Sequence, residues 1–502
     1  MNQKLRLGSL SVLLSLVGGG LLISPAQAVD APRAVEQDTG LDILLTQKAR
    51  DILERVRHVD GQARSRRVEV STDIANGVVT VALDRVFLPA DYGPSFEDQR
   101  SEISFGLLHW AEQAAPFSRV VFLYDGKEIE YYFPEIKAAD DAAREAGEAL
   151  RRTRGTPGSG MAFVAAGHGY FYSYKDNRWV TSRDEWNGVS EGLLTPSYAA
   201  DLKAMIEQRS QMPVIRPRVQ ITGTTHPPSG EEWWTIAARY AIAEQYQAET
   251  KIWNTYAGST LWDREEREDI NSRPLLANHH GAEVAIHLHS NGEPSGAARG
   301  TRVIVQPGRP MDAALAESVL CSMKELIHSV PVYADFTVAP APHAENKGEN
   351  REAKMPSIIV ETAFHTNPDD AKALQDPVFR TASMKGVEKG YRLWAAGKTC
   401  EPLVLHPIPD TNVPVQSARD IEVRYAGNPQ YPLSVGLSLT TCSEAGACSS
   451  STQTFDDPMQ PVVINLACNG IGTGVARWSA LLRDADGVAS APVEFSQACV
   501  RT

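Results

Sequence analysis

The chain has 502 residues, more than one hydrophobic core ordinarily serves, so several domains are expected. Its formal net charge at pH 7 is −13, and no basic cluster interleaved with aromatic residues offsets this charge. The composition therefore fits a globular protein and excludes nucleic acid as the expected partner.

Residues 1–28 have the pattern of an export signal. Lys4 and Arg6 precede an apolar stretch, which ends in Ala26-Gln27-Ala28. This pattern predicts a secretory signal peptide that is cleaved after Ala28. No later window is apolar over the roughly 18 residues needed to span a bilayer. We therefore expect an exported protein, periplasmic or in the extracellular cell wall, with no transmembrane segment in the mature chain.

Six cysteines in an exported chain indicate disulfide bonds rather than thiolate metal sites. None belongs to a Cys-x-x-Cys pair. The sequence spacing makes three pairs the simplest arrangement, although the geometry of the fold could favour others. These pairs are Cys321 with Cys400, Cys442 with Cys448, and Cys468 with Cys499.

Residues 30–137 are predicted to form an α+β domain. A helical segment, LDILLTQKARDILERVRHV, precedes two strand-like runs, GVVTVALDRVFL and RVVFLYDGKEIEYYF. Between these runs, FEDQRSEISFGLLHWAEQA has apolar residues at helical spacing. This order of strand, helix and a strand ending in YDGKEIE resembles the GerMN domain of sporulation and cell-envelope proteins. The resemblance carries no catalytic motif.

Two further segments differ in composition from this domain. Residues 138–159 are rich in alanine and charge and end in Gly, Pro and Ser, which predicts a helical linker that runs into a flexible joint. Residues 401–502 begin with a proline-rich stretch and continue in short alternating runs such as LSVGLSLTTC and PVVINLAC. Such runs predict an all-β, immunoglobulin-like sandwich.

Residues 160–400 are predicted to form an α/β domain. Short apolar runs alternate with longer amphipathic stretches, which indicates a mostly parallel sheet covered by helices on both faces. Ligands of such sheets bind beyond the carboxyl ends of the strands. Three apolar runs end there in reactive side chains: MAFVAAGH in His168, AEVAIHLH in His287 and His289, and PSIIVE in Glu361. Two histidines and a carboxylate suit a catalytic zinc that keeps one position open for water.

These three stretches resemble the signatures of the zinc-dependent N-acetylmuramoyl-L-alanine amidases, which lyse bacterial cell walls. The matching segments are AAGHGY, RPLLANHHGAEVAIHLHSNG and MPSIIVETAFHTNPDDAKAL. The resemblance implies that His168 and His289 bind zinc, that Glu361 is catalytic, and that Asn291 contacts substrate. The family's remaining ligand is a glutamate at the start of a helix, which Glu191 fits. Nearby Asp184 and Glu185 compete for this assignment.

The chain departs from the family pattern in several places. Ala165 and Ala166 precede the first turn, where an acidic residue is common, and Tyr170 follows it in place of a glycine. His287 either faces the metal beside His289 or supports packing or substrate contact. Residues 210–262 look like an insertion, which forms either a lid or wall at the substrate or a packed amphipathic helix.

The resemblance implies zinc-dependent hydrolysis of the amide between N-acetylmuramic acid and L-alanine in peptidoglycan. Zinc lowers the pKa of bound water to about 7, and Glu361 would act as the general base. Two alternatives stay open: an exported zinc peptidase or carboxypeptidase, and a non-catalytic envelope-binding protein with a degenerate hydrolase domain. The sequence predicts no oligomeric state.

Overall fold

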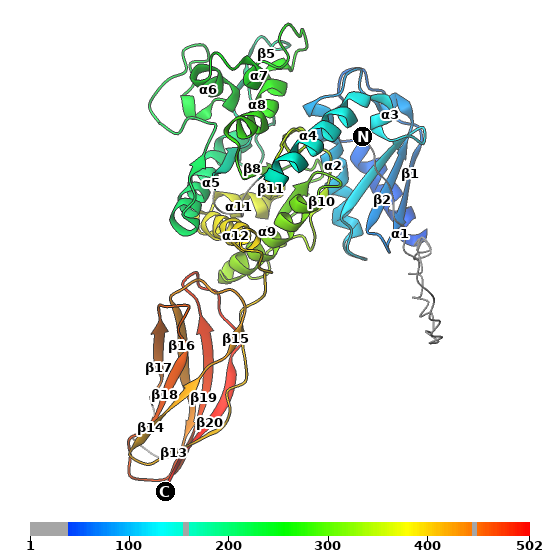
Figure 1. Ribbon diagram of the computed structural model, residues 1–502. Helices are drawn as coiled ribbons and strands as arrows, with labels where there is room; N and C mark the ends of the chain where they lie inside the picture. The colour runs from blue at the N-terminus through cyan, green and yellow to red at the C-terminus, as the bar shows by residue number, and fades with distance from the viewer. Residues whose placement is uncertain (1–38, 154–159, 444–448, 502) are drawn as a thin grey trace, which may run out of the picture.

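The computed structural model describes residues 39–153, 160–443 and 449–501. Along the chain, a region built on a three-stranded sheet is followed by a central region with a six-stranded sheet and by a C-terminal region of strands (Figure 1). The predicted signal peptide, 1–28, lies outside the described residues. Within the described ranges, no helix has the length and apolar composition needed to cross a bilayer.

The N-terminal region combines a small mixed sheet with helices, as its sequence pattern predicts. The second strand pairs antiparallel with the first and parallel with the third, so the helix between the last two strands is a crossover. Alternate residues of the second strand, Val79, Val81 and Leu83, are fully buried. The elements are α1 (Thr39–Leu53), β1 (Val68–Asp73), β2 (Val78–Leu83), η1 (Arg85–Phe87), α2 (Pro94–Ala111), β3 (Arg119–Tyr124) and α3 (Ile129–Tyr132).

The described part of the predicted linker is helical. Helix α4 (Pro134–Thr153) packs against the central region, where Asp140 accepts a hydrogen bond from Arg309 at 3.2 Å. The predicted flexible joint, 154–159, lies outside the described residues. The domain boundaries near residues 137, 159 and 400 stay predictions.

The central sheet is mostly parallel. Strands β7, β4, β8 and β11 run in one direction, and β9 pairs antiparallel with β11, so that β9 and β10 run in the other. The sheet has the order β10 (His343–Ala344), β9 (Arg302–Val305), β11 (Ser357–Phe364), β8 (Val284–Asn291), β4 (Ala162–Ala166) and β7 (Val214–Ile215). The α/β prediction for this region is therefore confirmed.

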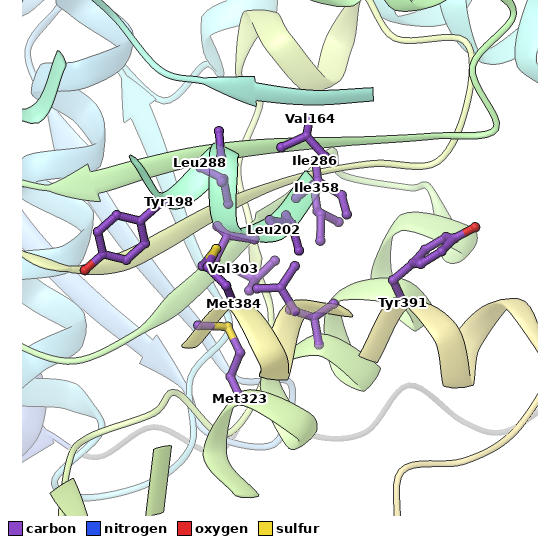
Figure 2. Close-up of a cluster of buried hydrophobic side chains, with 14 of the residues drawn as sticks. Val164, Tyr198, Leu202, Ile286, Leu288, Val303, Met323, Ile358, Met384 and Tyr391 are labelled. Carbon is purple, nitrogen blue, oxygen red and sulfur yellow. The ribbon is translucent and has the colours of Figure 1, made fainter. Parts of the chain in front are cut away.

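One face of the central sheet packs against four helices. Val164, Ile286 and Ile358 from three neighbouring strands lie in one apolar cluster with Leu202, Met323, Met384 and Tyr391 from the helices (Figure 2). Because strand side chains alternate in direction, the even-numbered residues of these strands supply this face. The helices are α5 (Glu191–Met205), α9 (Pro310–His328), α11 (Pro368–Gln375) and α12 (Pro377–Ala395).

The opposite face is covered in two parts. Phe163 and Ala285 pack with α6 (Ala238–Gln245) and α8 (Arg264–His280). Ile304, Ile359 and Phe364 instead belong to the core of the N-terminal region. The ring of Phe105 in α2 lies edge-on to that of Phe364, with centroids 5.9 Å apart. The N-terminal region and the central sheet thus share one hydrophobic core.

Short elements complete the central region. They are β5 (Phe171–Ser173), β6 (Arg178–Val180), the π-helical turn η2 (Ile206–Ser210), η3 (Trp233–Thr235), α7 (Thr250–Trp253), η4 (Pro331–Tyr333) and α10 (Gly348–Arg351). The segment read from sequence as an insertion, 210–262, holds η3, α6, α7 and edge strand β7.

The C-terminal region is all β, as predicted. A five-stranded sheet and a two-stranded sheet contribute to one apolar cluster, which contains Val435, Ile464 and Leu482. The larger sheet has the order β13 (Thr411–Pro414), β20 (Val493–Val500), β19 (Gly474–Arg483), β16 (Leu433–Cys442) and β17 (Ser451–Phe455). The others pair β14 (Ser417–Glu422) with β18 (Val463–Cys468), and β12 (Val404–Leu405) with β15 (Tyr425–Ala426).

Two of the three predicted disulfides are present. Cys321 in α9 is bonded to Cys400, and Cys468 in β18 is bonded to Cys499 in β20. The third predicted pair, Cys442 with Cys448, lies partly outside the described residues.

The shared core predicts that Phe105→Ala destabilises the protein although the residue lies outside the central sheet. Loss of a buried phenylalanine side chain should lower the free energy of unfolding by about 3–5 kcal/mol. Denaturant unfolding of the full chain measures this. Ile43→Ala, at a residue 72% exposed in α1, is the control and should change stability by less than about 0.5 kcal/mol. Equal effects of the two substitutions would contradict a shared core.

Candidate active site

The pairing of two central strands places His289 next to Glu361. Strands β8 and β11 are parallel, and Glu361 is directly opposite His289 in their register. Both are odd-numbered residues, so their side chains point to the face covered by α2 and α8 rather than to the face of Figure 2. An imidazole and a carboxylate therefore meet near the carboxyl ends of two strands.

The Gly-His-Gly turn brings a second imidazole to the same place. It follows β4, and His168 adopts a left-handed conformation with φ of 55°. A Cβ on Gly167 would lie 2.3–2.7 Å from the ring atoms of His289, and one on Gly169 would lie 2.7 Å from the backbone nitrogen of Ala237. Since no real Cβ approaches so closely, both glycines are required for the two histidine rings to lie 4.8 Å apart.

Residues of the 210–262 segment hold this turn in place. The buried guanidinium of Arg218 donates to the carbonyl oxygens of Gly167 (3.3 Å), Gly192 (2.8 Å) and Trp234 (2.7 Å). The backbone N–H of Tyr170 donates to the Thr235 carbonyl at 2.9 Å. Part of the segment therefore packs against the turn. Its helix α6 is buried against α8, which agrees with the predicted packed helix, and a role as a lid or substrate wall stays a prediction.

Glu191 supplies a carboxylate close to both imidazoles. It is the first residue of α5 and is 3% exposed. Its Oε1 lies 3.0 Å from Nδ1 of His289 and 3.6 Å from Nε2 of His168. Asp184 and Glu185, the alternative carboxylates, are exposed and lie outside this group.

His168, Glu191 and His289 form a group that fits a divalent metal. One ligand atom from each lies within 4.8 Å of the others, and all three residues are buried. Four ligands at about 2.0–2.1 Å from zinc would be about 3.3 Å apart, close to the 3.0 and 3.6 Å that separate the Glu191 oxygen from the two imidazoles. Oε2 of Glu191 is buried without a hydrogen-bond partner among the described residues, so the carboxylate has an oxygen to give to an ion. We call these three residues the metal-binding group.

The charges around the group act differently on the two histidines. Burial lowers the pKa of His168 to about 3, against the opposing effect of Glu191, so its imidazole is neutral as a metal ligand must be. Burial also lowers the pKa of His289, but the carboxylates of Glu349 and Glu191 raise it by more, to about 10. Without an ion, His289 therefore carries the positive charge that balances these carboxylates.

Residues 163–391 match the family model described as N-acetylmuramoyl-L-alanine amidase. This segment is a member of that family. The match agrees with the motifs around His168, His289 and Glu361. A comparison with curated proteins finds no match. The comparisons do not test the GerMN resemblance of residues 30–137, which stays a prediction.

Solved amidase structures are similar to about half of the chain. The CwlD amidase from Clostridioides difficile, solved in complex with the GerS lipoprotein, is 14% identical over 48% of this chain and 100% of its own, with a TM-score of 0.33. The amidase AmiC2 of Nostoc punctiforme is 15% identical over 47% and 97%, with a TM-score of 0.30. The amidase Ami1 from Mycobacterium smegmatis is 12% identical over 49% and 100%, with a TM-score of 0.31.

The amidase segment also places charged residues at the site that the sequence analysis did not assign to it. Oε2 of Glu349 in α10 lies 3.0 Å from Nε2 of His289, and the same carboxylate forms an ion pair with Arg273 of α8. Arg273 belongs to the second amidase signature, but its partner Glu349 lies in a one-turn helix with no sequence pattern of its own. His287 is fully buried, with Nδ1 3.6 Å from Glu349, and lies outside the metal-binding group.

The predicted substrate contact, Asn291, is placed differently from the other site residues. Its side chain is 1% exposed, and its Oδ1 accepts a hydrogen bond from the Gly292 backbone at 2.8 Å. It does not line the pocket at the metal-binding group, which His168, His289 and Glu361 do. Its role in substrate binding stays a prediction.

The close approach of Gly167 to His289 predicts a specific effect of Gly167→Ala. The added methyl group would displace the imidazole, and the affinity for zinc should fall by about 10–100-fold, as for other changes that misorient a metal ligand. Competition with a chromogenic chelator measures this affinity. Gly436→Ala in β16, where the nearest atom to the new Cβ is 3.9 Å away, is the matched control and should bind zinc like the unaltered protein. Equal affinities in the two variants would contradict the packing described for the turn.

Proposed function

We propose that the protein hydrolyses the amide between N-acetylmuramic acid and L-alanine in peptidoglycan, with zinc held by His168, Glu191 and His289 and with Glu361 as the general base. The observation that carries this proposal is the register of β8 and β11, which sets Glu361 beside a residue of the metal-binding group. The family match of residues 163–391 supports the substrate class.

Zinc, when bound, would polarise the amide carbonyl and lower the pKa of the attacking water. Glu361 has the properties that a general base needs. Burial, reinforced by Glu191 and opposed by His289, raises the pKa of its carboxyl to about 7. Its Oε2 is buried and has no hydrogen-bond partner among the described residues. A base with a pKa near neutrality can take a proton from water and return it to the departing amine.

The place of action is part of the same proposal. The N-terminal pattern of residues 1–28 and the two disulfides of the described chain support export to the periplasm or the cell wall, where thiols are oxidised and where peptidoglycan lies.

Hydrolysis of purified cell wall tests the reaction and its regiochemistry. The amidase releases stem peptides with a new L-alanine amino terminus, which amino-terminal labelling and mass spectrometry detect. Release of free D-alanine would instead support an exported carboxypeptidase, and binding to the wall without any release would support a non-catalytic protein. Chelation should abolish the release, and zinc should restore it.

Two substitutions separate the base from the metal ligands. Glu361→Gln should lower the rate by about 10²–10⁴-fold, because the proton acceptor is lost, and should leave one zinc bound. His168→Ala should lose both zinc and activity. Rate and metal content of each purified variant are measured together. Glu185→Gln, at an exposed carboxylate near the site, is the control and should keep both. Loss of zinc with Glu361→Gln, or full activity of either site variant, would contradict these roles.

A further inference from the structure

The pocket at the metal-binding group contains a carboxylate from outside the amidase segment. Asp98, in the second turn of α2, lines this pocket together with His168, His289 and Glu361. Helix α2 belongs to the N-terminal region, whose three-stranded sheet is separate from the central sheet. The site thus includes an acidic side chain that the family match does not cover.

Asp98 is held by two cations of the central region. Its Oδ1 lies 2.9 Å from Nζ of Lys347 and 3.2 Å from a terminal guanidinium nitrogen of Arg183. Burial raises the pKa of Asp98, but Arg183 and Lys347 lower it by more, so that it lies well below its ordinary value. For Lys347, burial lowers the pKa and the charges of Asp98 and Glu345 raise it above its ordinary value. The three groups are therefore charged together inside the pocket.

Arg183 connects this carboxylate to the metal-binding group. Its Nε lies 3.6 Å from Oε2 of Glu191, while its outer nitrogen contacts Asp98. Among the described residues, its buried Nη1 has no hydrogen-bond partner. A guanidinium binds a carboxylate best through two parallel hydrogen bonds. Asp98 contacts Arg183 through one terminal nitrogen, so the guanidinium could bind a second carboxylate oxygen.

The present arrangement leaves no room for the proposed substrate. The cavity has a volume of about 30 Å³. This is enough for a few water molecules but not for a muramoyl peptide. The first turn of α2 lies along the pocket, where Glu97 accepts hydrogen bonds from the Gly348 backbone at 3.1 Å and from Arg351 at 3.0 Å. Displacement of α2 side chains would enlarge this space.

We propose that Arg183 and Lys347 form a subsite for a carboxylate on the peptide side of the scissile amide, and that Asp98 occupies this subsite until substrate replaces it. The inference rests on the proposed function, because it assigns the peptide part of that substrate to these two cations. A substrate carboxylate would take over the ion pairs of Asp98, so the exchange leaves no buried cation without a partner. Arg183 then sets the distance between the bound carboxylate and the metal-binding group.

Ligand binding to the full chain tests this subsite without hydrolysis. The Glu361→Gln variant is the reference protein, and the probes are N-acetylmuramoyl-L-alanyl-D-glutamate and its diamide, which lacks the carboxylates of the glutamate. Calorimetry gives the ratio of the two affinities within one protein preparation, so partial misfolding of a variant cancels. The reference should prefer the free acid.

Three further substitutions are made in this background. Asp98→Asn should raise the affinity for the free acid about tenfold, because the competing charge is removed, and should leave that for the diamide unchanged. Lys347→Gln should lower the affinity for the acid about tenfold and spare the diamide. Glu112→Gln is the matched control: Glu112 directly follows α2 and pairs with Arg302 at 2.7 Å, outside the pocket, so this variant should keep the ratio of the reference.

Two results would overturn the proposal in distinguishable ways. If both probes bind but neither Asp98→Asn nor Lys347→Gln changes their affinity ratio, the subsite is wrong and the amidase function stands. If neither probe binds to the reference or to Asp98→Asn, the muramoyl-peptide substrate is itself wrong, and the subsite falls with it.

Discussion

The parallel pairing of β8 with β11 is the constraint on which the site depends. A shift of one residue between these strands would turn the side chain of either His289 or Glu361 to the opposite face of the sheet. The buried side chains on both faces prevent such a shift, because Ile286 and Ile358 on one face and Ala285 and Ile359 on the other would exchange surroundings. The packing of an ordinary α/β core thus sets the distance between the proposed base and a proposed metal ligand.

Contacts outside these two strands complete the site. The Gly-His-Gly turn contributes His168 only because its glycines allow a left-handed backbone and a close approach to His289, and Arg218 fixes the turn from the other side. Burial then makes the histidine neutral and the glutamate basic, which are the states that metal binding and proton transfer need.

Much of this arrangement could be predicted from the sequence, because local patterns encode it. Strand periodicity and the order of apolar runs predicted the central sheet, and the ends of three runs predicted His168, His289 and Glu361 as neighbours. The start of a helix favoured Glu191 over Asp184 and Glu185, and the structure gathers Glu191 with the two histidines. Each of these residues lies within or directly beside a regular element whose direction the pattern reveals.

The site residues that the sequence did not predict depend on contacts between segments far apart in the chain. Glu349 lies in a one-turn helix without periodicity, and no local signal brings it to His289. Asp98 lies in an amphipathic helix that reads as part of a separate domain. Its position at the pocket follows from the packing of Phe105 on Phe364, which no pattern within either segment contains.

The same packing limits how the chain can be divided. A truncated protein beginning at residue 160 would keep the metal-binding group but would expose Ile304, Ile359 and Phe364 to solvent. A bare apolar sheet face of this kind favours aggregation. The N-terminal region therefore both covers this apolar face and lines the pocket, so a deletion that removes it would change both features at once.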